Sequence, residues 1–416
     1  MKEVAKNKKS KVDIDQLLAI DDKRRRLISE TEKLKSELKK RSKTKPSPGE
    51  IAPLKDLSGK IKNIDTELAD VEKEYQDLML LVPNIYSADT PVGPDEKANR
   101  EVARWGEPTK FDFKPKDHIT LGKELDLVDL EAGAKISGYR GYYLKNEAVL
   151  LHFAVLWHAI NKMRENGFDL FVPPTLLREF ALIGSGHFPG GKDEIYRIGN
   201  PGRLANGSAK EPTFLGGTSE PSLLAYYADK TLNEKYLPVK VCGFSQCYRS
   251  EIGSYGKDTK GLYRIHEFMK VEQIVLCKND IEESNEWLEK LRTIAEEMLQ
   301  DLKLPYRVVQ LSTGDMGTGK YKMYDLETYM PSMASKNFYG ETHSDSNLTD
   351  WQARRLNIKY KTKDGKIEFV HALNNTVIAS PRILIAILEN YQQKDGSVVV
   401  PKVLQKYCGI KVIKKK

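Results

Sequence analysis

The sequence predicts an α+β protein, in which two long antiparallel helices precede a mixed domain that contains an antiparallel sheet. Three observations support this fold class. Apolar residues recur at heptad spacing through residues 17–78, which is typical of paired helices. Two strand patterns, at 243–251 and 264–277, flank a glycine-rich loop. From Asp126 to the end of the chain the pattern is a mixture of helices and strands.

The N-terminal helices are predicted from alternating steps of three and four residues. In the first helix the positions are Leu17, Ile20, Leu27, Leu34 and Leu38, with Arg24 and Thr31 completing the pattern. In the second they are Leu54, Leu57, Ile61, Ile64, Leu68, Val71, Tyr75 and Leu78. The connection at 42–53 is rich in proline and is expected not to continue a helix, so the helices fold back as a coiled-coil hairpin. Residues 1–12 are basic and are expected to be frayed.

Positive charge is concentrated at the distal end of this hairpin. Residues 33–62 hold ten basic and three acidic side chains, a net charge of +7, whereas the whole chain carries +8. A solvated helix surface mixes the two signs more evenly, so a phosphate backbone is the favoured partner. A coiled coil that only dimerises the protein is the alternative. The candidate phosphate-binding residues are Lys33, Lys39, Lys40, Arg41, Lys43 and Lys45.

The remaining chain divides into a connection and a large domain. Residues 83–116 carry five prolines and are expected to be a linker. The predicted organisation is therefore an arm at 1–82, this linker, and a domain at 117–416. Within the domain, a helix at 146–166 is expected to lead into a strand at 168–174.

Three further segments complete the prediction for the domain. Residues 187–212 are rich in Gly, Asn and Ser and are expected to form a surface loop, and 281–302 a helix. Residues 314–320 match the spacing GxxxxGK of a phosphate-binding loop. However, Tyr321 occupies the place of the Ser or Thr that binds magnesium, and a strand pattern follows instead of a helix. The segment is therefore interpreted as a turn between strands.

Composition excludes several classes of protein. No apolar run reaches the length of a membrane span, and the N-terminus lacks the apolar core of a signal peptide. The four cysteines show neither CxxC pairs nor zinc spacing, so we expect free thiols in a reducing, cytoplasmic environment. No catalytic role is assigned to His266 or His343, and Ser344 lacks the GxSxG elbow of a hydrolase nucleophile.

Charged side chains on the central strand pair indicate a ligand site. Arg249, Glu251, Arg264 and Glu272 lie on otherwise apolar strands, where an unpaired charge is costly, and Phe268 lies among them. Guanidinium groups suit phosphate oxygens, and an aromatic ring can stack on a base. The pattern therefore favours a nucleotide site, and a sheet with one solvated face is the alternative.

These residues carry a resemblance to a known family. YRSE at 248–251, the loop, and RIHEF at 264–268 resemble motif 2 of the class II aminoacyl-tRNA synthetases, in particular the bacterial seryl enzymes. Thr218-Ser219-Glu220 matches their TxE, and 371–392 is similar to motif 3, with its arginine at Arg382. The helix and strand at 146–174 look like motif 1, which forms the dimer interface. The resemblance implies a class II antiparallel-sheet catalytic domain and a homodimer.

The resemblance also implies an activity. Seryl enzymes activate L-serine with ATP to seryl-adenylate and transfer it to the 3′ end of tRNA(Ser), with tRNA(Sec) as a second candidate. The hairpin would bind the long variable arm of the tRNA, and Lys257 and Lys260 would meet its acceptor end. One departure is that the chain is expected to start inside a region where seryl enzymes carry a further short helix.

The family roles transfer to matching positions of this chain. Arg249 would bind the α-phosphate and the serine carboxylate, and Arg382 would cover the adenine and reach the γ-phosphate, so these two are the expected catalytic residues. Glu251 would bind the adenine amino group, Arg264 the outer phosphates, and Phe268 would stack on the adenine. Glu341 and Ser344 would hold Mg²⁺ and belong to the ATP site. The implied serine-binding residues are Thr218, Glu220, Arg249, Glu272, Asn374 and Thr376.

There are three alternatives to this function and one to the role of Glu341. Class II enzymes for Thr, Pro, Gly or His usually add a C-terminal anticodon-binding domain, but 34 residues follow Arg382. A plain loop acid is the alternative for Glu341. Related ligases that load a carrier protein lack the long hairpin. A catalytically inactive paralogue that binds RNA or serves a structural role is opposed by the complete set of ATP-site residues.

Overall fold

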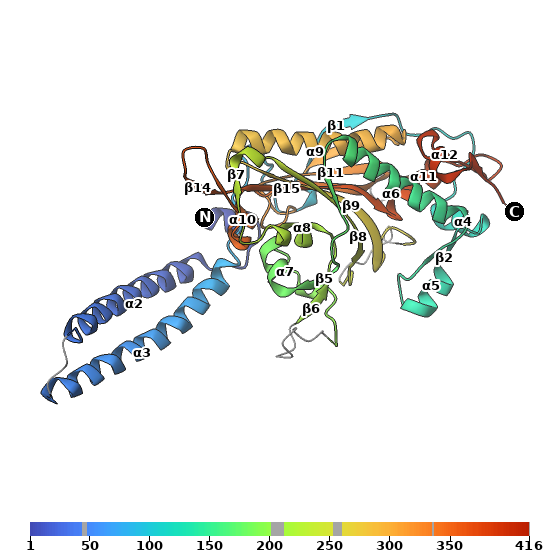
Figure 1. Cartoon of the computed structure of the whole chain (residues 1–416). Coiled ribbons are helices and arrows are strands. Elements are labelled where there is room, and N and C mark those ends of the chain that lie inside the picture. Colours follow the sequence, from blue (N-terminus) through green and yellow to red (C-terminus); the bar gives the residue numbers. More distant parts are fainter. Residues whose placement is uncertain (44–47, 201–211, 253–259, 335–336, 416) are drawn as a thin grey trace. The chain divides into compact units, whose positions relative to one another are not determined.

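The computed structural model describes residues 1–43, 48–200, 212–252, 260–334 and 337–415 (Figure 1). The chain forms two compact units, Met1–Pro83 and Asn84–Lys416. The first unit is helical and the second is a mixed α+β unit with a large, mainly antiparallel sheet, so the predicted fold class is confirmed. No helix among the described residues is long and apolar enough to cross a membrane.

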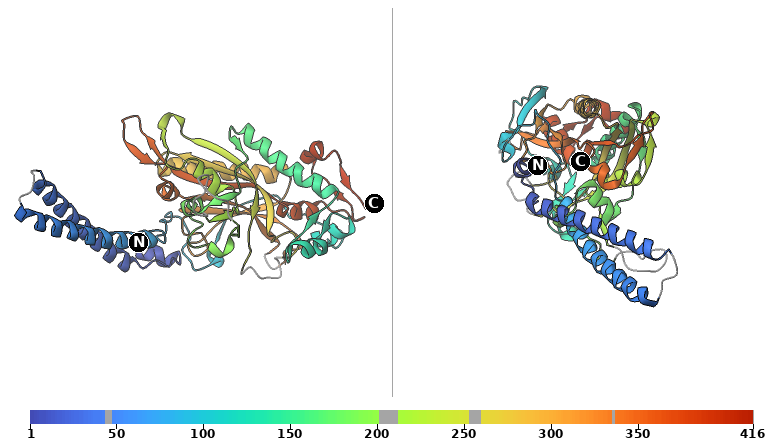
Figure 2. Two further views of the ribbon diagram at one scale, coloured as in Figure 1. Left: turned by 60° about the horizontal axis from the view of Figure 1, so that its bottom comes forward. Right: turned by 90° about the vertical axis from the view of Figure 1, so that its left-hand side faces the viewer.

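Two long helices of the first unit lie side by side (Figure 2). They follow a short helix, and the bounds are α1 Lys2–Asn7, α2 Ile14–Arg41 and α3 Pro48–Met79. Asp13 caps α2, because its carboxylate accepts hydrogen bonds from the backbone N–H groups of Asp15 and Gln16. The buried seam consists of predicted heptad positions, namely Leu17, Leu27, Thr31, Leu57, Ile61 and Val71. The Arg24 guanidinium, at another of these positions, lies 4.6 Å from the centroid of the Tyr75 ring.

Two expectations for the first unit were wrong. Residues 1–12 are not frayed: α1 forms, Ala5 and Val12 are buried, and Ser10 Oγ donates to Leu81 O at 2.7 Å. A short helix therefore does precede α2. The connection ends earlier than predicted, since α3 begins at Pro48 and includes Pro53. Pro48 lies at the first helical position, where no N–H donor is needed, and Pro53 removes only one hydrogen bond near the helix start.

An eight-stranded sheet organises the second unit (Figure 1). All neighbouring strands are antiparallel except β4 and β8, which are parallel. In spatial order the strands are β1 Arg100–Trp105, β10 Tyr306–Gln310, β11 Lys322–Tyr329, β12 Tyr339–Asn347, β15 His371–Ser380, β9 Glu267–Cys277, β8 Val239–Tyr248 and β4 Asp169–Phe171. The neighbouring strands β9 and β8, sixth and seventh in this order, correspond to the strand pair predicted around the glycine-rich loop.

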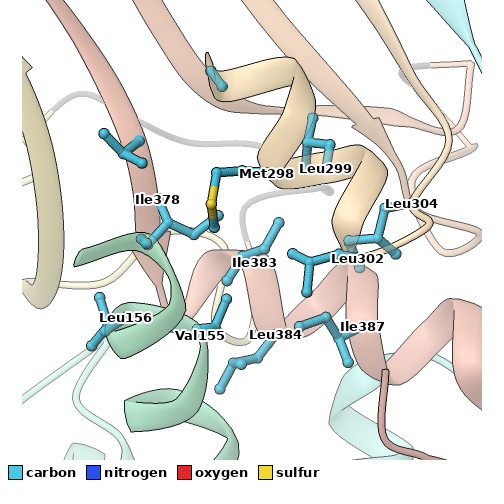
Figure 3. Packing of buried hydrophobic residues seen from close by; sticks show 14 of the residues in the cluster. Val155, Leu156, Met298, Leu299, Leu302, Leu304, Ile378, Ile383, Leu384 and Ile387 are labelled. Carbon is cyan, nitrogen blue, oxygen red and sulfur yellow. The ribbon is translucent and has the colours of Figure 1, made fainter. Parts of the chain in front are cut away.

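Helices α6, α9 and α11 supply much of the main core (Figure 3). Val155 and Leu156 come from α6, Met298 and Leu299 from α9, and Ile383, Leu384 and Ile387 from α11. The longer helices are α6 Glu147–Glu165, α9 Ile281–Asp301 and α11 Arg382–Tyr391. The predicted helices at 146–166 and 281–302 are thereby confirmed, as is the strand pattern after Gly314–Lys320, which becomes β11.

Short elements complete the second unit. The helices are η1 Glu96–Ala98, α4 His118–Glu124, α5 Leu130–Ser137, α7 Glu179–Ser185, η2 Lys192–Glu194, α8 Glu220–Tyr226, η3 Glu234–Tyr236, α10 Trp351–Leu356 and α12 Lys402–Cys408. Small sheets contain β2 Val128–Asp129, β3 Tyr143–Leu144, β5 Leu176–Arg178, β6 Thr213–Leu215, β7 Thr231–Asn233, β13 Lys359–Lys361, β14 Ile367–Phe369, β16 Val398–Val399 and β17 Val412–Ile413.

Two expectations for the second unit need correction. Residues 84–116 are not a separate linker, because they belong to this compact unit and contain β1, which pairs with β10. The side chains of this edge strand are mostly exposed, so it carries no apolar alternation that would have marked it. The predicted surface loop 187–212 is partly internal. Phe188 and Ile195 are buried against Phe214, and residues 201–211 lie outside the described part.

Candidate active site

A single cavity in the second unit is lined by most of the predicted ATP- and serine-binding side chains. Strands β9, β12 and β15 and the first turns of α8 and α11 contribute to its wall. The predicted residues that line it are Thr218, Glu220, Arg249, Glu251, Phe268, Glu272, Glu341, Ser344, Asn374, Thr376 and Arg382. Arg264 lines an adjoining pocket, which shares Arg249 and Glu251 with the cavity. Segments more than 160 residues apart in sequence are thus brought together.

The strand alternation explains why these side chains point into the cavity. On β9, Phe268, Lys270 and Glu272 are two residues apart and line the cavity, whereas Gln273 points the other way and donates to Leu291 O on α9. On β15 the same holds for Asn374 and Thr376, while Asn375 donates to Leu291 O. One face of the sheet therefore carries the site and the opposite face packs on α9.

Two of the predicted phosphate-binding arginines, Arg264 and Arg249, are held by hydrogen bonds to their neighbours. Arg264 Nη1 donates to Glu251 Oε2 at 3.0 Å, and Arg249 Nε donates to Gly217 O at 3.3 Å. The Arg249 guanidinium also lies 5.2 Å from the centroid of the Phe268 ring. Burial acts to raise the pKa of Glu251, but the Arg264 guanidinium outweighs it, and the pKa lies below its usual value. Glu251 is therefore a charged acceptor between two cationic groups.

Arg382 is the first residue of α11 and is held by contacts with Tyr263 and Glu341. Its Nε donates to Tyr263 O at 3.2 Å and its Nη1 to Glu341 O at 3.0 Å. The guanidinium lies 4.4 Å from the centroid of the Tyr263 ring. Because these contacts restrain the arginine in advance, little side-chain entropy is lost when it binds an anion.

The expected serine end of the cavity contains two buried carboxylates with different environments. Glu220 Oε1 accepts from Gln352 Nε2 at 2.6 Å and from Asn374 Nδ2 at 3.0 Å. Burial raises the pKa of Glu220, but Lys320 and other positive neighbours lower it overall. Glu272 pairs with Lys270 Nζ at 2.5 Å, yet burial dominates and raises the pKa of Glu272.

Several cavity residues escaped the sequence-based prediction. Lys270 could have been found, because it shares the alternation of Phe268 and Glu272 on β9. Lys320 is the lysine of the GxxxxGK pattern at 314–320. That segment was interpreted as a turn, but the side chain of Lys320 nevertheless lines the cavity. Gln352, from α10, reaches Glu220 only through the tertiary fold. Gln352 therefore carries no local signal of its role.

The candidate magnesium residues, Glu341 and Ser344, offer oxygen ligands of the kind a hard cation prefers. Glu341 and Ser344 lie on β12, and a register shift in the pairing of β11 with β12 falls between them. Asp325 on β11 pairs in register with Ser344, and its buried Oδ1 has no hydrogen-bond partner among the described residues. Burial, then Glu341, raises the pKa of Asp325 well above its usual value. Oxygen donors beside an unsatisfied carboxylate oxygen fit Mg²⁺, whose coordination nucleotide phosphates and water would complete.

The remaining predicted residues belong to the proposed tRNA contacts and to the two histidines. On the first unit, the side chains of Lys33, Lys39, Lys40, Arg41 and Lys43 are exposed, and Lys260 is exposed on the second. Lys45 and Lys257 lie outside the described residues. His343 is buried and hydrogen-bonded to Val377 O, and burial lowers the pKa of this imidazole to about 4, so its environment is that of a core residue.

The chain is similar to known proteins along nearly its whole length. Residues 1–86 match the N-terminal domain of seryl-tRNA synthetases, and residues 206–391 match the class II core domain of tRNA synthetases (G, H, P, S and T). Serine--tRNA ligase from Treponema denticola is 42% identical over 417 residues, covering 98% of this chain and 96% of the relative. The corresponding enzyme from Deinococcus radiodurans is 42% identical over 415 residues, covering 98% of this chain and 95% of the relative.

A solved structure shows the same similarity in three dimensions. Seryl-tRNA synthetase from Pyrococcus horikoshii, complexed with ATP, has a TM-score of 0.87 and 37% identity. The match covers 97% of this chain and 93% of that structure. Because relatives far above 30% identity match along nearly the whole length, the chain belongs to the seryl-tRNA synthetase family of class II aminoacyl-tRNA synthetases.

Proposed function

We propose that this chain activates L-serine with ATP and transfers the seryl group to the 3′ end of tRNA(Ser), with tRNA(Sec) as a second candidate substrate. The observation that carries the proposal is the single cavity, which joins an arginine-rich, aromatic end to a buried carboxylate–amide end. The first end suits a nucleotide and the second suits a small amino acid. An inactive paralogue would not need both ends, and no observation favours one.

Activation would be an in-line displacement. A carboxylate oxygen of serine attacks the α-phosphorus of ATP, the bond to the bridging oxygen breaks, and pyrophosphate leaves with the electron pair. Arg249 would bind the α-phosphate and the serine carboxylate, and Arg382 and Arg264 the outer phosphates. Phe268 would stack on the adenine, and Glu251 would accept from its amino group. Mg²⁺, held by Glu341 and Ser344, would neutralise phosphate charge.

Serine selection would rest on the buried polar end of the cavity. Glu220 and Glu272 would provide negative charge for the ammonium group of serine. Thr218, Asn374 and Thr376 would provide hydrogen-bonding groups for its small hydroxyl. All five side chains are buried, so an amino acid without a hydroxyl would leave polar groups unpaired. Such a site rejects alanine more strongly than a hydrophobic pocket rejects a smaller ligand.

Charging of tRNA tests the proposed function. Purified protein with ATP, Mg²⁺ and labelled serine should transfer label to a tRNA(Ser) transcript and leave a transcript without the long variable arm poorly charged. Separate reactions with tRNA(Sec) would decide the second candidate. RNA binding without any transfer of serine would contradict the proposed activity and favour the inactive paralogue.

The basic residues of the first unit are proposed to bind the phosphate backbone of the variable arm. Replacing Lys39, Lys40, Arg41 and Lys43 by alanine should raise the Kd for tRNA by roughly 10- to 100-fold at low salt. The slope of log K against log salt should fall by about 3, whereas activation without tRNA should be unchanged. A matched control removes four lysines of the second unit: Lys361, Lys363, Lys366 and Lys394. Equal loss in both variants would mean that only net charge matters.

We propose that the protein is a cytoplasmic homodimer. Leu150, Phe153 and Trp157 form an exposed stripe on α6, and Trp157 is 55% exposed. Beside it, edge strand β4 carries Leu170, 46% exposed, followed by Val172 at 84%. An apolar helix stripe next to an open sheet edge suits a symmetric contact. The cytoplasmic location is supported by four buried cysteine thiols.

Changing Trp157 tests the dimer. Trp157→Asp should shift the molar mass in solution from about twice to about once the chain mass, because it places a charge in an apolar contact. Tyr236→Asp is the matched control, since Tyr236 is 64% exposed on η3. A monomeric wild-type protein, or a Trp157→Asp variant that remains dimeric, would contradict this surface. Light scattering at several concentrations provides the measurement.

A further inference from the structure

His118, the first residue of α4, contacts a buried carboxylate of α11. Its side chain is buried, and its Nδ1 lies 2.9 Å from Oε1 of Glu389. Glu389 is 0% exposed and also accepts from the backbone N–H of His118 and from both the N–H and the hydroxyl of Ser332. Because the carboxylate can only accept from the ring, the proton lies on Nδ1. The imidazole is thereby fixed in one tautomer.

The other ring nitrogen of His118 holds the chain just before Arg264. Leu262 N–H donates to His118 Nε2 at 3.3 Å, and Leu262 is 0% exposed. Gly261 precedes it with φ of +64°, and a Cβ there would lie 2.3 Å from Nε2. Only glycine therefore allows this close approach of backbone and ring. A buried N–H that lost this acceptor would be left unsatisfied, which is costly.

Helix α11 holds the same segment at a second point. Arg382 is seven residues before Glu389, two helical turns, so both side chains lie on similar faces of the helix. Arg382 Nε donates to Tyr263 O at 3.2 Å, one residue beyond the Leu262 contact. Between the two points, the buried Ile383, Leu384 and Ile387 anchor the helix in the core (Figure 3). The helix therefore provides a rigid reference for residues 261–263.

We propose that His118 is a positioning residue, which links Glu389 to Leu262 and thereby sets the placement of Tyr263, Arg264 and Arg382 for ATP. The inference rests on the proposed function, since it assumes that these arginines bind the nucleotide. His118 touches no substrate in this scheme. Without its Nε2 acceptor, Arg264 and Arg382 would sample positions in which they no longer converge on the phosphates. Serine-binding residues such as Glu220 are held separately and should not be affected.

Two amide substitutions separate the two bonds of the imidazole. In His118→Asn, the amide takes the place of Nδ1, so the bond to Glu389 can remain and the acceptor for Leu262 is lost. In His118→Gln, an oxygen can take the place of Nε2 and accept from Leu262, and Glu389 keeps its backbone and Ser332 donors. Both substitutions replace the imidazole by a carboxamide, and they differ in which of the two hydrogen bonds can remain.

The expected result is a selective loss in the asparagine variant. In serine-dependent ATP–pyrophosphate exchange, His118→Asn should lower kcat/KM for ATP by about tenfold or more, while the KM for serine stays within about twofold. His118→Gln should recover most of the activity. In hydrogen–deuterium exchange, the Leu262 amide should exchange about tenfold faster in His118→Asn than in the wild type or His118→Gln.

Other outcomes would overturn the inference. Equal losses in both variants, or a parallel rise in the KM for serine, would indicate a general packing role. Unchanged ATP kinetics and unchanged Leu262 exchange in His118→Asn would mean that the contact positions nothing. If the wild-type protein showed no pyrophosphate exchange with any amino acid, the proposed function would be wrong. The Leu262 measurement would then still decide whether His118 holds this segment.

Discussion

Replacing Arg382 by alanine is expected to lower serine-dependent ATP–pyrophosphate exchange by roughly a thousandfold. The arginine is proposed to cover the adenine and to reach the γ-phosphate, and its contacts with Tyr263 and Glu341 fix it in that position. Its loss removes charge stabilisation that a flexible or distant cation cannot replace. Arg382→Lys keeps the charge without the planar fork and should lose activity to an intermediate extent.

Two comparisons show whether the Arg382 effect is specific. Binding of tRNA to Arg382→Ala should remain within about twofold of wild type, because the proposed tRNA contacts lie elsewhere. Arg307→Ala is the control: this arginine pairs with Glu327 on the sheet, and it does not line the cavity. Parallel loss of exchange and tRNA affinity in Arg382→Ala would contradict the separation of the two functions.

Glu220→Gln is expected to raise the KM for serine by about 100-fold. Gln352 Nε2 and Asn374 Nδ2 both donate to Glu220 Oε1, so the amide oxygen of the variant can keep these two bonds. What the variant removes is the negative charge proposed to hold the ammonium group. Glu297→Gln is the control. Glu297 forms an ion pair with Lys162 on the surface, and its substitution should leave serine kinetics unchanged. An unchanged serine KM in Glu220→Gln would place the ammonium elsewhere.

The same substitution should have a pH-dependent effect on stability. Burial raises the pKa of Glu220, but Lys320 and its other neighbours lower it overall, so the folded pKa lies below the unfolded one. A carboxylate of this kind contributes stability above its unfolded pKa, about 4.3, and loses it as pH falls through the folded pKa. The free energy of unfolding of Glu220→Gln should therefore fall below wild type at pH 7, with a smaller difference at pH 4. A difference that grows with acid would contradict this sign.

Strand periodicity explains which parts of the site could be predicted from the sequence. Phe268 and Glu272, or Asn374 and Thr376, are found at steps of two or four on strands with strong apolar patterns. Arg382 was marked by the apolar helix that it begins. Recognising their shared cavity depended on family motifs, because periodicity alone does not place one strand beside another.

The missed features have different physical causes. Lys320 and Gln352 lie on a turn and a short helix, and their positions depend on tertiary packing. Strand β1 is exposed at the sheet edge, so burial imposed no pattern on its sequence. Pro53 lies within α3, although a proline was expected to end the helix. That expectation applies fully only to helix interiors, far from the first turns. Local sequence signals fail where tertiary contacts or helix ends decide the conformation.

Amino-acid-dependent ATP–pyrophosphate exchange, measured without tRNA across all the standard amino acids, tests the central claim most directly. The cavity is proposed to hold ATP beside a small amino acid whose hydroxyl and ammonium groups meet buried polar partners. We expect exchange with serine, exchange with alanine lower by roughly 10⁴-fold, and none above background with larger side chains. Exchange that is as fast with alanine as with serine would contradict the proposed serine site. A lack of exchange with every amino acid would contradict the proposed activity.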